Sequence, residues 1–184
     1  MNIRVPVRLA MLALTCTVVV ALAGTVRAEP SAIAVIDTSI IMRDSAAAKS
    51  IKAQVDQQVK SFQQWGKTNQ DKLEAEGAAL EKQRTVLSRD QLAQKETDLR
   101  KKFSDFQQDA RQRDRKIQQA ATNAQQELIK MLNVVVSDIA KKQSISLVLP
   151  KEATVYTGST KDITDETLRA LNAKLPSVKL AVAP

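Results

Sequence analysis

The strongest constraint on the fold is the lack of helix-breaking residues between Pro30 and Pro150. This interval contains no proline, and its only glycines are Gly66 and Gly77. A proline inside a helix costs roughly 3 kcal/mol, and the loops of ordinary globular domains usually carry proline and glycine. The interval is also rich in Gln, Lys, Ala, Glu and Leu, which favour helices. The sequence therefore predicts very long helices that fold back on each other.

Two narrow apolar stripes indicate that these helices form a hairpin. Apolar residues recur at spacings near three, four or seven in both halves of the interval. The first stripe comprises Ile51, Val55, Phe62, Leu73, Leu80 and Leu87. The second comprises Leu92, Leu99, Phe103, Phe106, Ala110, Ile117, Ala124, Leu128, Met131, Val135 and Ile139. Arms of about 45 to 55 residues would extend about 65 to 80 Å, and such narrow seams predict flexible, splaying arms.

The reversal between the arms is expected at residues 85–90. Ser88 and Gln91 have the spacing of a capping box, in which Ser88 is the N-cap of a new helix and Gln91 is its N3 residue. One continuous helix through this region is an alternative, because no glycine marks the turn.

Short strands are expected on both sides of the hairpin. The runs 33–36, 145–149 and 154–156 are β-branched or aliphatic and are bounded by turn signals, so they predict one small sheet at the base of the arms. Such a sheet has open edges and too little core to be stable alone, which favours oligomerisation through the base. The residues expected in this interface are Ile33, Val35, Leu147, Leu149 and Val155.

A short amphipathic helix is expected near the end of the chain. Thr164 can act as its N-cap, and Asp165 and Glu166 would lie favourably at its positive end. The predicted fold class is α+β, with coiled-coil-like antiparallel arms on a small sheet base. We divide the chain into a signal peptide at residues 1–28, a discontinuous β-rich oligomerisation base at 29–42 and 144–184, and helical arms at 43–143.

The first residues predict export through a cleaved signal peptide. Arg4 and Arg8 precede an apolar run at 9–24, and Val26-Arg27-Ala28 fits a cleavage site after Ala28. A membrane span is disfavoured because the run is shorter than the roughly 20 residues required. Lipidation at Cys16 is disfavoured because the preceding residues form a poor lipidation box. After cleavage the chain has no cysteine, so we expect an exported protein without disulfides.

Positive charge is concentrated in the middle of the helical interval. The chain has a net charge of +8, and residues 82–116 contain eleven Lys or Arg and six Asp or Glu. A solvated helix face explains such a run, and so does attraction to acidic partners or an anionic membrane. The residues that we expect to bind an acidic partner or an anionic surface are Lys82, Arg84, Lys95, Arg100, Lys101 and Lys102.

Enzymatic chemistry is not expected. The chain has no histidine, and its single cysteine lies in the predicted signal peptide, so neither a catalytic triad nor a usual zinc site can form. The spacing of Asp162, Asp165 and Glu166 suits helix capping better than metal binding. No phosphate loop surrounds Gly158, and export separates the chain from nucleic acid. We therefore expect no cofactor, no metal and no nucleic-acid partner.

Several segments resemble the Skp/OmpH family of periplasmic chaperones. The matching segments are Ile33–Asp37, Ser45–Lys49, Ser146–Leu149, Ala153–Tyr156 and Asp162–Asn172, together with the composition and length of the arms. The resemblance implies a homotrimer in which a β base holds three hairpins around a central cavity. It also implies a holdase that keeps unfolded outer-membrane proteins soluble without ATP.

The arms suit such a role physically, although two other functions remain open. Dispersed aromatic residues offer many weak contacts that together produce high affinity, and Phe62 and Trp65 are the client-binding candidates. Phe103 and Phe106 are expected instead in the hairpin seam, because they lie on the apolar stripe. The alternatives are a structural or adaptor coiled coil of the cell envelope, and an envelope protein that binds anionic lipid or lipopolysaccharide.

Overall fold

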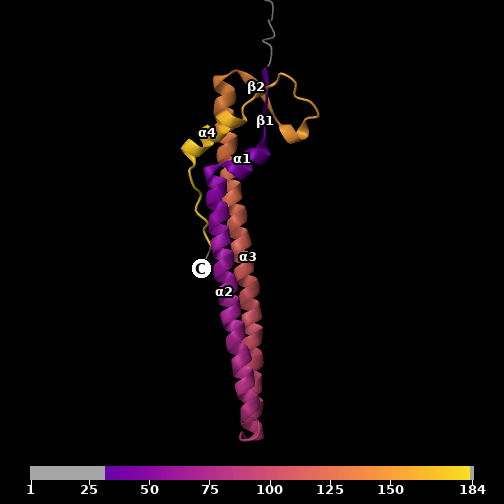
Figure 1. Ribbon diagram of the computed structural model, residues 1–184, viewed down its shortest axis with the longest axis vertical. Coiled ribbons are helices and arrows are strands. Elements are labelled where there is room, and N and C mark those ends of the chain that lie inside the picture. The colour runs from indigo at the N-terminus through magenta and orange to yellow at the C-terminus, as the bar shows by residue number, and fades with distance from the viewer. Residues whose placement is uncertain (1–31, 183–184) are drawn as a thin grey trace, which may run out of the picture. The chain divides into compact units, whose positions relative to one another are not determined.

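The computed structural model describes residues 32–182, and the predicted signal peptide therefore lies outside the described residues. The described part contains a small sheet, a long helical hairpin and a short helix close to the end of the chain (Figure 1). In chain order the elements are β1 (Ala32–Ile36), α1 (Thr38–Asp44), α2 (Ala46–Gln83), α3 (Arg89–Lys142), β2 (Ile145–Pro150), the 3₁₀ turn η2 (Lys151–Ala153), β3 (Lys161–Asp162) and α4 (Thr164–Lys174).

The hairpin consists of α2 and α3, which run antiparallel beside each other (Figure 1). At 1.5 Å per residue, the 38 residues of α2 extend about 57 Å and the 54 residues of α3 about 81 Å. The first arm is shorter than expected because Ser45 has an extended backbone and separates α1 from α2. The Ser45 hydroxyl accepts a hydrogen bond from the Ala48 backbone at 3.2 Å and so caps the new helix.

The turn between the arms contains the capping box expected from the sequence. The backbone N–H of Gln91 donates to Ser88 Oγ at 3.3 Å, and the backbone N–H of Ser88 donates to Gln91 Oε1 at 3.1 Å. These reciprocal bonds satisfy donors that the first turn of α3 cannot pair within the helix. The capping box is confirmed, and the alternative of one continuous helix is wrong.

The sheet has the strand order β2-β1-β3, and both neighbours of β1 are parallel to it. The strands expected at 33–36 and 145–149 are found, and Ile33 pairs with Leu147 and Val35 with Leu149. The expectation of a third strand at 154–156 is wrong. Val155 and Tyr156 are fully exposed, because this segment loops away from the sheet after η2. Its place beside β1 is taken by the two residues of β3.

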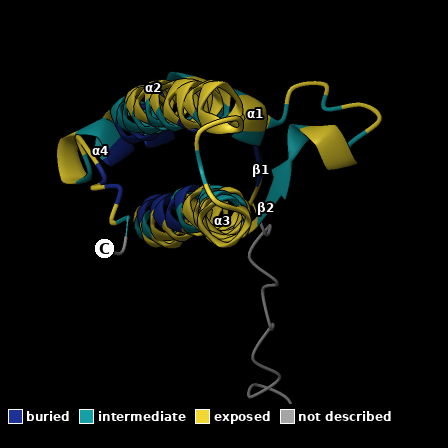
Figure 2. Ribbon diagram, turned by 90° about the horizontal axis from the view of Figure 1, so that it is seen from below, coloured by how far each residue is buried: buried dark blue, intermediate teal, exposed yellow. Residues whose placement is uncertain are grey.

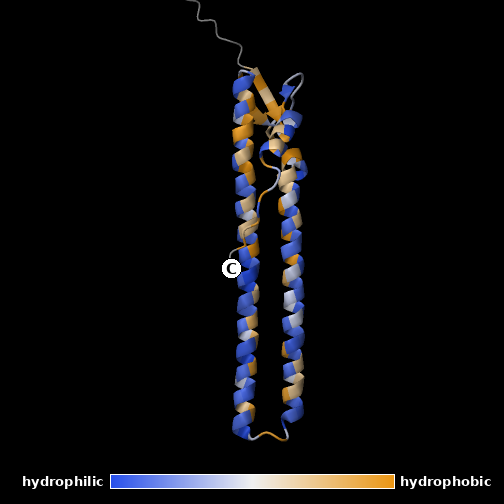
Figure 3. Cartoon of the chain, turned by 90° about the vertical axis from the view of Figure 1, so that its left-hand side faces the viewer, coloured by the Kyte–Doolittle hydropathy of each residue, from blue (hydrophilic) through white to orange (hydrophobic). Residues whose placement is uncertain are grey.

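The buried core lies at the base end of the hairpin. In α3 the buried residues all fall between Ile117 and Ile139, and no residue from Arg89 to Lys116 is buried. These buried residues lie on the side of α3 that faces α2 (Figure 2). The far halves of both arms are mostly hydrophilic along their surfaces (Figure 3). The hairpin therefore has a packed region near the sheet and a distal region with few buried apolar contacts.

Helix α4 docks on the beginning of α2 and the end of α3. Its Asn172 Oδ1 accepts a hydrogen bond from the Ala46 backbone at 2.8 Å, and its Lys174 pairs with Asp138 at 2.6 Å. Both acidic residues expected in its first turn, Asp165 and Glu166, are found there. These contacts attach the base to both arms.

The expected capping role of Thr164 is wrong. Thr164 is the first residue of α4 rather than its N-cap, and the capping position is held by Ile163, which forms no side-chain cap. The Thr164 hydroxyl instead accepts a hydrogen bond from the Asp37 backbone at 2.8 Å and donates to Asp162 Oδ1 at 2.5 Å. It therefore joins the end of β1 to β3, a tertiary role that a local capping pattern does not reveal.

Candidate functional site

An aromatic cluster connects the middle of the two arms. The Phe62 and Trp65 rings of α2 stack with centroids 6.0 Å apart, and the Phe106 ring of α3 lies 5.4 Å from Trp65. The Arg113 guanidinium covers the Trp65 ring at 4.5 Å from its centroid. Phe106 thus packs in the seam as expected. Phe103, expected there too, exposes 38% of its surface and lies outside this cluster.

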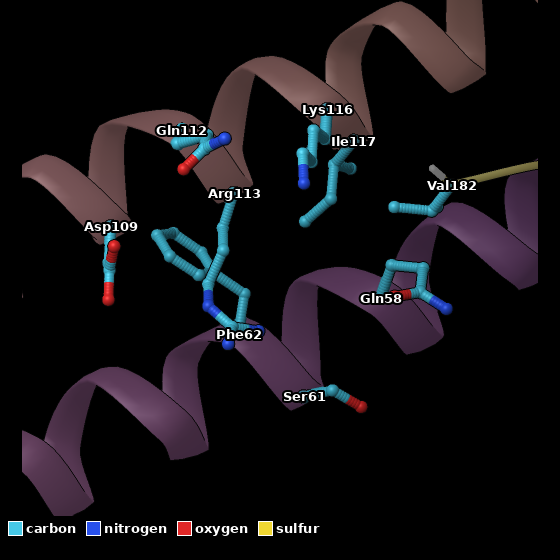
Figure 4. Close-up of a pocket in the computed structure, with 9 residues that line it drawn as sticks. All are labelled: Gln58, Ser61, Phe62, Asp109, Gln112, Arg113, Lys116, Ile117 and Val182. Carbon is cyan, nitrogen blue, oxygen red and sulfur yellow. The ribbon is translucent and has the colours of Figure 1, made fainter. Parts of the chain in front are cut away.

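A cavity of about 410 Å³ lies next to this cluster. Side chains of α2 and α3 and Val182 surround it (Figure 4). Its lining combines the apolar Phe62 and Ile117 with polar and charged groups. The polar and charged members are Gln58, Ser61, Asp109, Gln112, Arg113 and Lys116. Such a mixed lining suits a peptide better than a purely apolar ligand, because peptide groups also require hydrogen-bond partners.

The residues after α4 form a C-terminal tail, residues 175–182, which runs along the hairpin. Val178 and Leu180 are buried in the core shared with both arms. The Gln54 side chain of α2 donates to the Val178 carbonyl at 2.7 Å and accepts from the Leu180 backbone N–H at 2.9 Å. Our sequence reasoning missed this tail. The alternation Val-Lys-Leu-Ala-Val at 178–182 is the signal that could have indicated a buried extended segment.

The basic candidates lie in the distal part of the arms, and four of them pair with carboxylates of the same chain. Arg84 pairs with Glu81 and Glu96, Arg100 with Glu96, Lys101 with Asp105 and Lys102 with Glu76. Lys102–Glu76 joins α2 to α3, and Arg84–Glu96 joins the residue directly after α2 to α3. Lys95 donates a hydrogen bond to Gln83, and Lys82 is exposed. The surplus positive charge is therefore partly neutralised locally.

The candidates for the oligomerisation base divide into exposed and buried positions. Ile33 and Leu147 each expose 47% of their surface and lie opposite each other in the sheet. Val155 is fully exposed, and Leu149 is half-buried. Val35 is only 3% exposed and belongs to the core of this chain. Helix α3 exposes two further apolar residues, Ile129 and Val134, which our sequence reasoning did not select.

The acidic residues near β3 hold the base together. Asp162 pairs with Lys151 at 2.6 Å and accepts hydrogen bonds from Thr164. Burial raises the pKa of Asp162, but the hydrogen bonds from Lys151 and Thr164 outweigh this effect and leave the pKa below its ordinary value. Glu166 accepts hydrogen bonds from Gln143. Within residues 32–182, no group of three or more acidic, histidine or cysteine side chains is placed to hold a metal ion.

The fold and these surfaces define a class of protein in which a long helical hairpin projects from a small parallel sheet. A family profile described as "Outer membrane protein (OmpH-like)" matches residues 32–171, and the chain belongs to this family. A crystal structure of a proposed OmpH-like outer membrane chaperone from Caulobacter crescentus has a TM-score of 0.77 and 20% sequence identity. The match covers 83% of this chain and 90% of the chain in that crystal structure. No curated protein matches the chain.

Within the part of the chain that the structure describes, no helix has both the length and the apolar character of a membrane span.

The family match ends at residue 171, which is the last buried residue of α4. The C-terminal tail therefore lies outside the region that the family profile describes.

Proposed function

We propose that this protein is an ATP-independent periplasmic holdase, which binds unfolded outer-membrane proteins between its helical arms and prevents their aggregation. The observation that carries this proposal is the distribution of burial along the hairpin. The arms are packed near the sheet, whereas their distal region has few buried apolar residues. Family membership and the fold shared with an OmpH-like structure support the same function.

The properties of the client explain why such arms are useful. An unfolded β-barrel protein exposes alternating apolar residues and unpaired backbone groups, and it aggregates unless it is isolated. A holdase has to bind many different sequences weakly at many points, and multivalency then produces tight overall binding. Half-buried aromatic rings such as Phe62 and Trp65, and exposed cations such as Lys82, offer contacts of this kind.

We further propose that the base assembles three copies of the chain around a central cavity. The sheet has only three strands, and β2 and β3 are edge strands with unpaired backbone groups. Such a small sheet requires additional packing for stability. Ile33, Leu147 and Val155 are exposed apolar residues suited to the contact between subunits, while Val35 supports the sheet from inside.

Aggregation of a client tests the holdase function. A urea-unfolded outer-membrane barrel protein is diluted with and without the purified protein, and light scattering is followed. Suppression of scattering at a near-stoichiometric concentration of trimer is the expected result. Unchanged scattering would contradict the holdase function.

The mass of the native particle tests the proposed assembly. It should equal the mass of three mature chains. A mass of one chain or of an open-ended filament would favour the adaptor coiled coil instead.

Charge variants test the role of the basic residues. Reversing Lys82, Arg84, Lys95, Arg100, Lys101 and Lys102 to Glu should weaken client binding and reduce its salt dependence. This variant also breaks ion pairs between the arms, so Lys82→Glu with Lys95→Glu is the cleaner design. Neither lysine forms an ion pair with another residue of the described part. Equal affinity in both variants would show that the basic stretch is only a solvated face.

The same variants test the lipid alternative. Co-sedimentation with vesicles of anionic lipid, or with lipopolysaccharide, should be lost in the charge variants if the arms bind such surfaces.

Export through a cleaved signal peptide predicts that the protein recovered from cells begins at Glu29. The mass of the intact mature chain measures this directly, and a retained segment 1–28 would contradict a periplasmic location.

A further inference from the structure

The C-terminal tail has the pattern of a β-strand although it pairs with no strand. Val178 and Leu180 are 2% and 9% exposed, Val182 is half-buried against the same core, and Lys179 and Ala181 between them are exposed. In extended backbone, alternate side chains point to the same face. The tail therefore presents one apolar face to the core shared by α2 and α3, and its last described residue, Val182, lies between side chains of both helices. In Figure 3 the tail runs in front of the two arms.

Gln54 binds the backbone of the tail rather than its side chains. Its amide nitrogen donates to the Val178 carbonyl, and its amide oxygen accepts from the Leu180 N–H, at 2.7 and 2.9 Å. Ser50, one turn earlier on α2, orients this amide by accepting a hydrogen bond from it at 3.0 Å. The Gln54 amide thus offers the tail one N–H donor and one carbonyl acceptor, as a neighbouring strand would. Both bonds go to backbone atoms, so they do not depend on the side chains of the bound segment.

The groove between α2 and α3 leads into a cavity at Val182. Gln58 follows Gln54 by one helical turn, about 6 Å along the axis, which is close to the about 6.6 Å that two residues of extended chain occupy. Gln58 and Val182 both line the cavity of about 410 Å³ that leads toward Phe62 (Figure 4). The arrangement at Gln54 is therefore followed, one step further along, by a second amide and by open volume.

We propose that the groove between α2 and α3 is a binding site for extended segments with apolar residues at alternate positions, and that the C-terminal tail occupies it until a client displaces it. The inference rests on the proposed holdase function and names the segment that this site accepts. Strands of outer-membrane barrels alternate between apolar and polar residues. The tail has the same alternation, so it acts as a ligand supplied by the chain itself.

An attached ligand also sets a threshold for binding. A segment joined to its own site has an effective concentration in the millimolar range, so weak and short competitors do not displace it. A client segment that reaches into the cavity beside Val182 gains contacts with residues such as Phe62 and Ile117. Longer alternating segments should therefore be selected over short apolar ones.

Hydrogen exchange in the intact protein tests displacement directly. The Leu180 amide should be protected in the free protein because it donates to Gln54. Addition of an unfolded outer-membrane barrel protein should accelerate its exchange at least tenfold. If Leu180 remains protected while the client co-elutes with the protein, the tail is not displaced and the inference is wrong.

A peptide in trans tests the groove separately. The probe is a synthetic peptide with the sequence of residues 176–182, and the variant protein lacks all residues after Pro176. Removal of the tail should tighten peptide binding about tenfold relative to the intact chain, because competition from the attached tail is lost. In the shortened chain, Gln54→Ala should weaken binding about tenfold, and Gln57→Ala, an exposed neighbour, should have no effect. A peptide with the same residues reordered so that the apolar ones are adjacent should bind more weakly.

The results separate failure of this inference from failure of the holdase function. Peptide binding that ignores both the tail and Gln54 would overturn the groove site even if client aggregation is suppressed. Peptide binding that requires Gln54 and a removed tail would support the site even if the barrel protein is not protected from aggregation. If the shortened chain loses its helical circular dichroism, exchange at Leu180 in the intact chain decides the question.

Discussion

The Arg113 guanidinium of α3 lies 4.5 Å from the centroid of the Trp65 ring of α2. The Phe62 and Phe106 rings also contact the Trp65 ring and complete the cluster. The nearest buried residue of α3 toward the base is Ile117, one turn away from Arg113. The cluster therefore marks the boundary between the packed part of the hairpin and its distal part, and it is where we expect separation of the arms to begin.

The Arg113→Ala substitution should loosen this boundary. Loss of an exposed cation–π contact is expected to reduce the free energy of unfolding by about 0.5 to 1 kcal/mol. Trp65 is the only tryptophan of the chain, so its fluorescence emission should shift to longer wavelength as water reaches the ring. Arg111→Ala, an exposed change on the same helix, is the control. An equal shift in the control would show that Arg113 has no special role.

Apolar truncations should have unequal effects along the arms. Leu128 is completely buried, so Leu128→Ala is expected to lower the free energy of unfolding by about 2 to 5 kcal/mol. Leu80→Ala in the distal part removes a half-buried side chain and should cost clearly less. Thermal unfolding followed by circular dichroism compares the two variants. Equal losses of stability would contradict the division into packed and open regions.

The two serine caps should differ in what they stabilise. Ser45→Ala and Ser88→Ala each remove an N-cap hydrogen bond worth about 1 kcal/mol. Ser45 is buried where α1, α2 and α4 meet, so its loss should lower the unfolding temperature of the whole protein. Ser88 is exposed at the turn, and its loss should only speed hydrogen exchange in the first turn of α3. Global destabilisation by Ser88→Ala would be the contrary result.

The stability of the folded protein should fall at acidic pH but change little near neutral pH. The hydroxyl of Ser39 and the backbone N–H of Ile40 lower the pKa of Asp37, and the Lys174 ammonium lowers the pKa of Asp138. A lowered folded-state pKa contributes stability above the unfolded value near 3.8, and this contribution is lost as the pH falls through the lower folded value. The chain has no histidine, so no side chain with an ordinary pKa titrates between pH 5 and 8.

We therefore expect constant unfolding temperatures between pH 5 and 8 and a decrease below about pH 4. Asp37→Asn should make the acid side of this profile shallower. Thermal unfolding followed by circular dichroism at several pH values measures both profiles. A profile of Asp37→Asn that is parallel to that of the unchanged protein would show that Asp37 contributes nothing to the acid dependence.

Local patterns in the sequence predicted the arms well because helices depend on contacts close in the chain. The spacing of Ile117, Ala124, Leu128 and Val135 places them on one face, and the structure buries all four. Ser88 and Gln91 lie only three residues apart, so their pairing follows from local geometry alone. The break at Ser45 was missed because a serine followed by three alanines resembles a tolerated helix residue as much as a cap.

Features made by distant segments were not predictable in the same way. The two residues of β3 have no strand pattern, and they pair with β1 only because α4 and Thr164 place them there. Val155 and Tyr156 have strong strand preference, but β-propensity depends on the surface available for packing. The tail was missed because its partner, Gln54, lies more than a hundred residues earlier and has no apolar signal.

The pairing of β1 with β2 joins the two ends of the excursion formed by residues 37–144. Closing a loop of this length costs much conformational entropy, so the pairing of β1 with β2 should form slowly. The turn between the arms and the parts of α2 and α3 next to it can pair early, because they are close in the chain. During synthesis β1 emerges long before its partner. The sheet is therefore complete only when nearly all of the polypeptide is available, and a chain interrupted before Ile145 has arms without a sheet at their base.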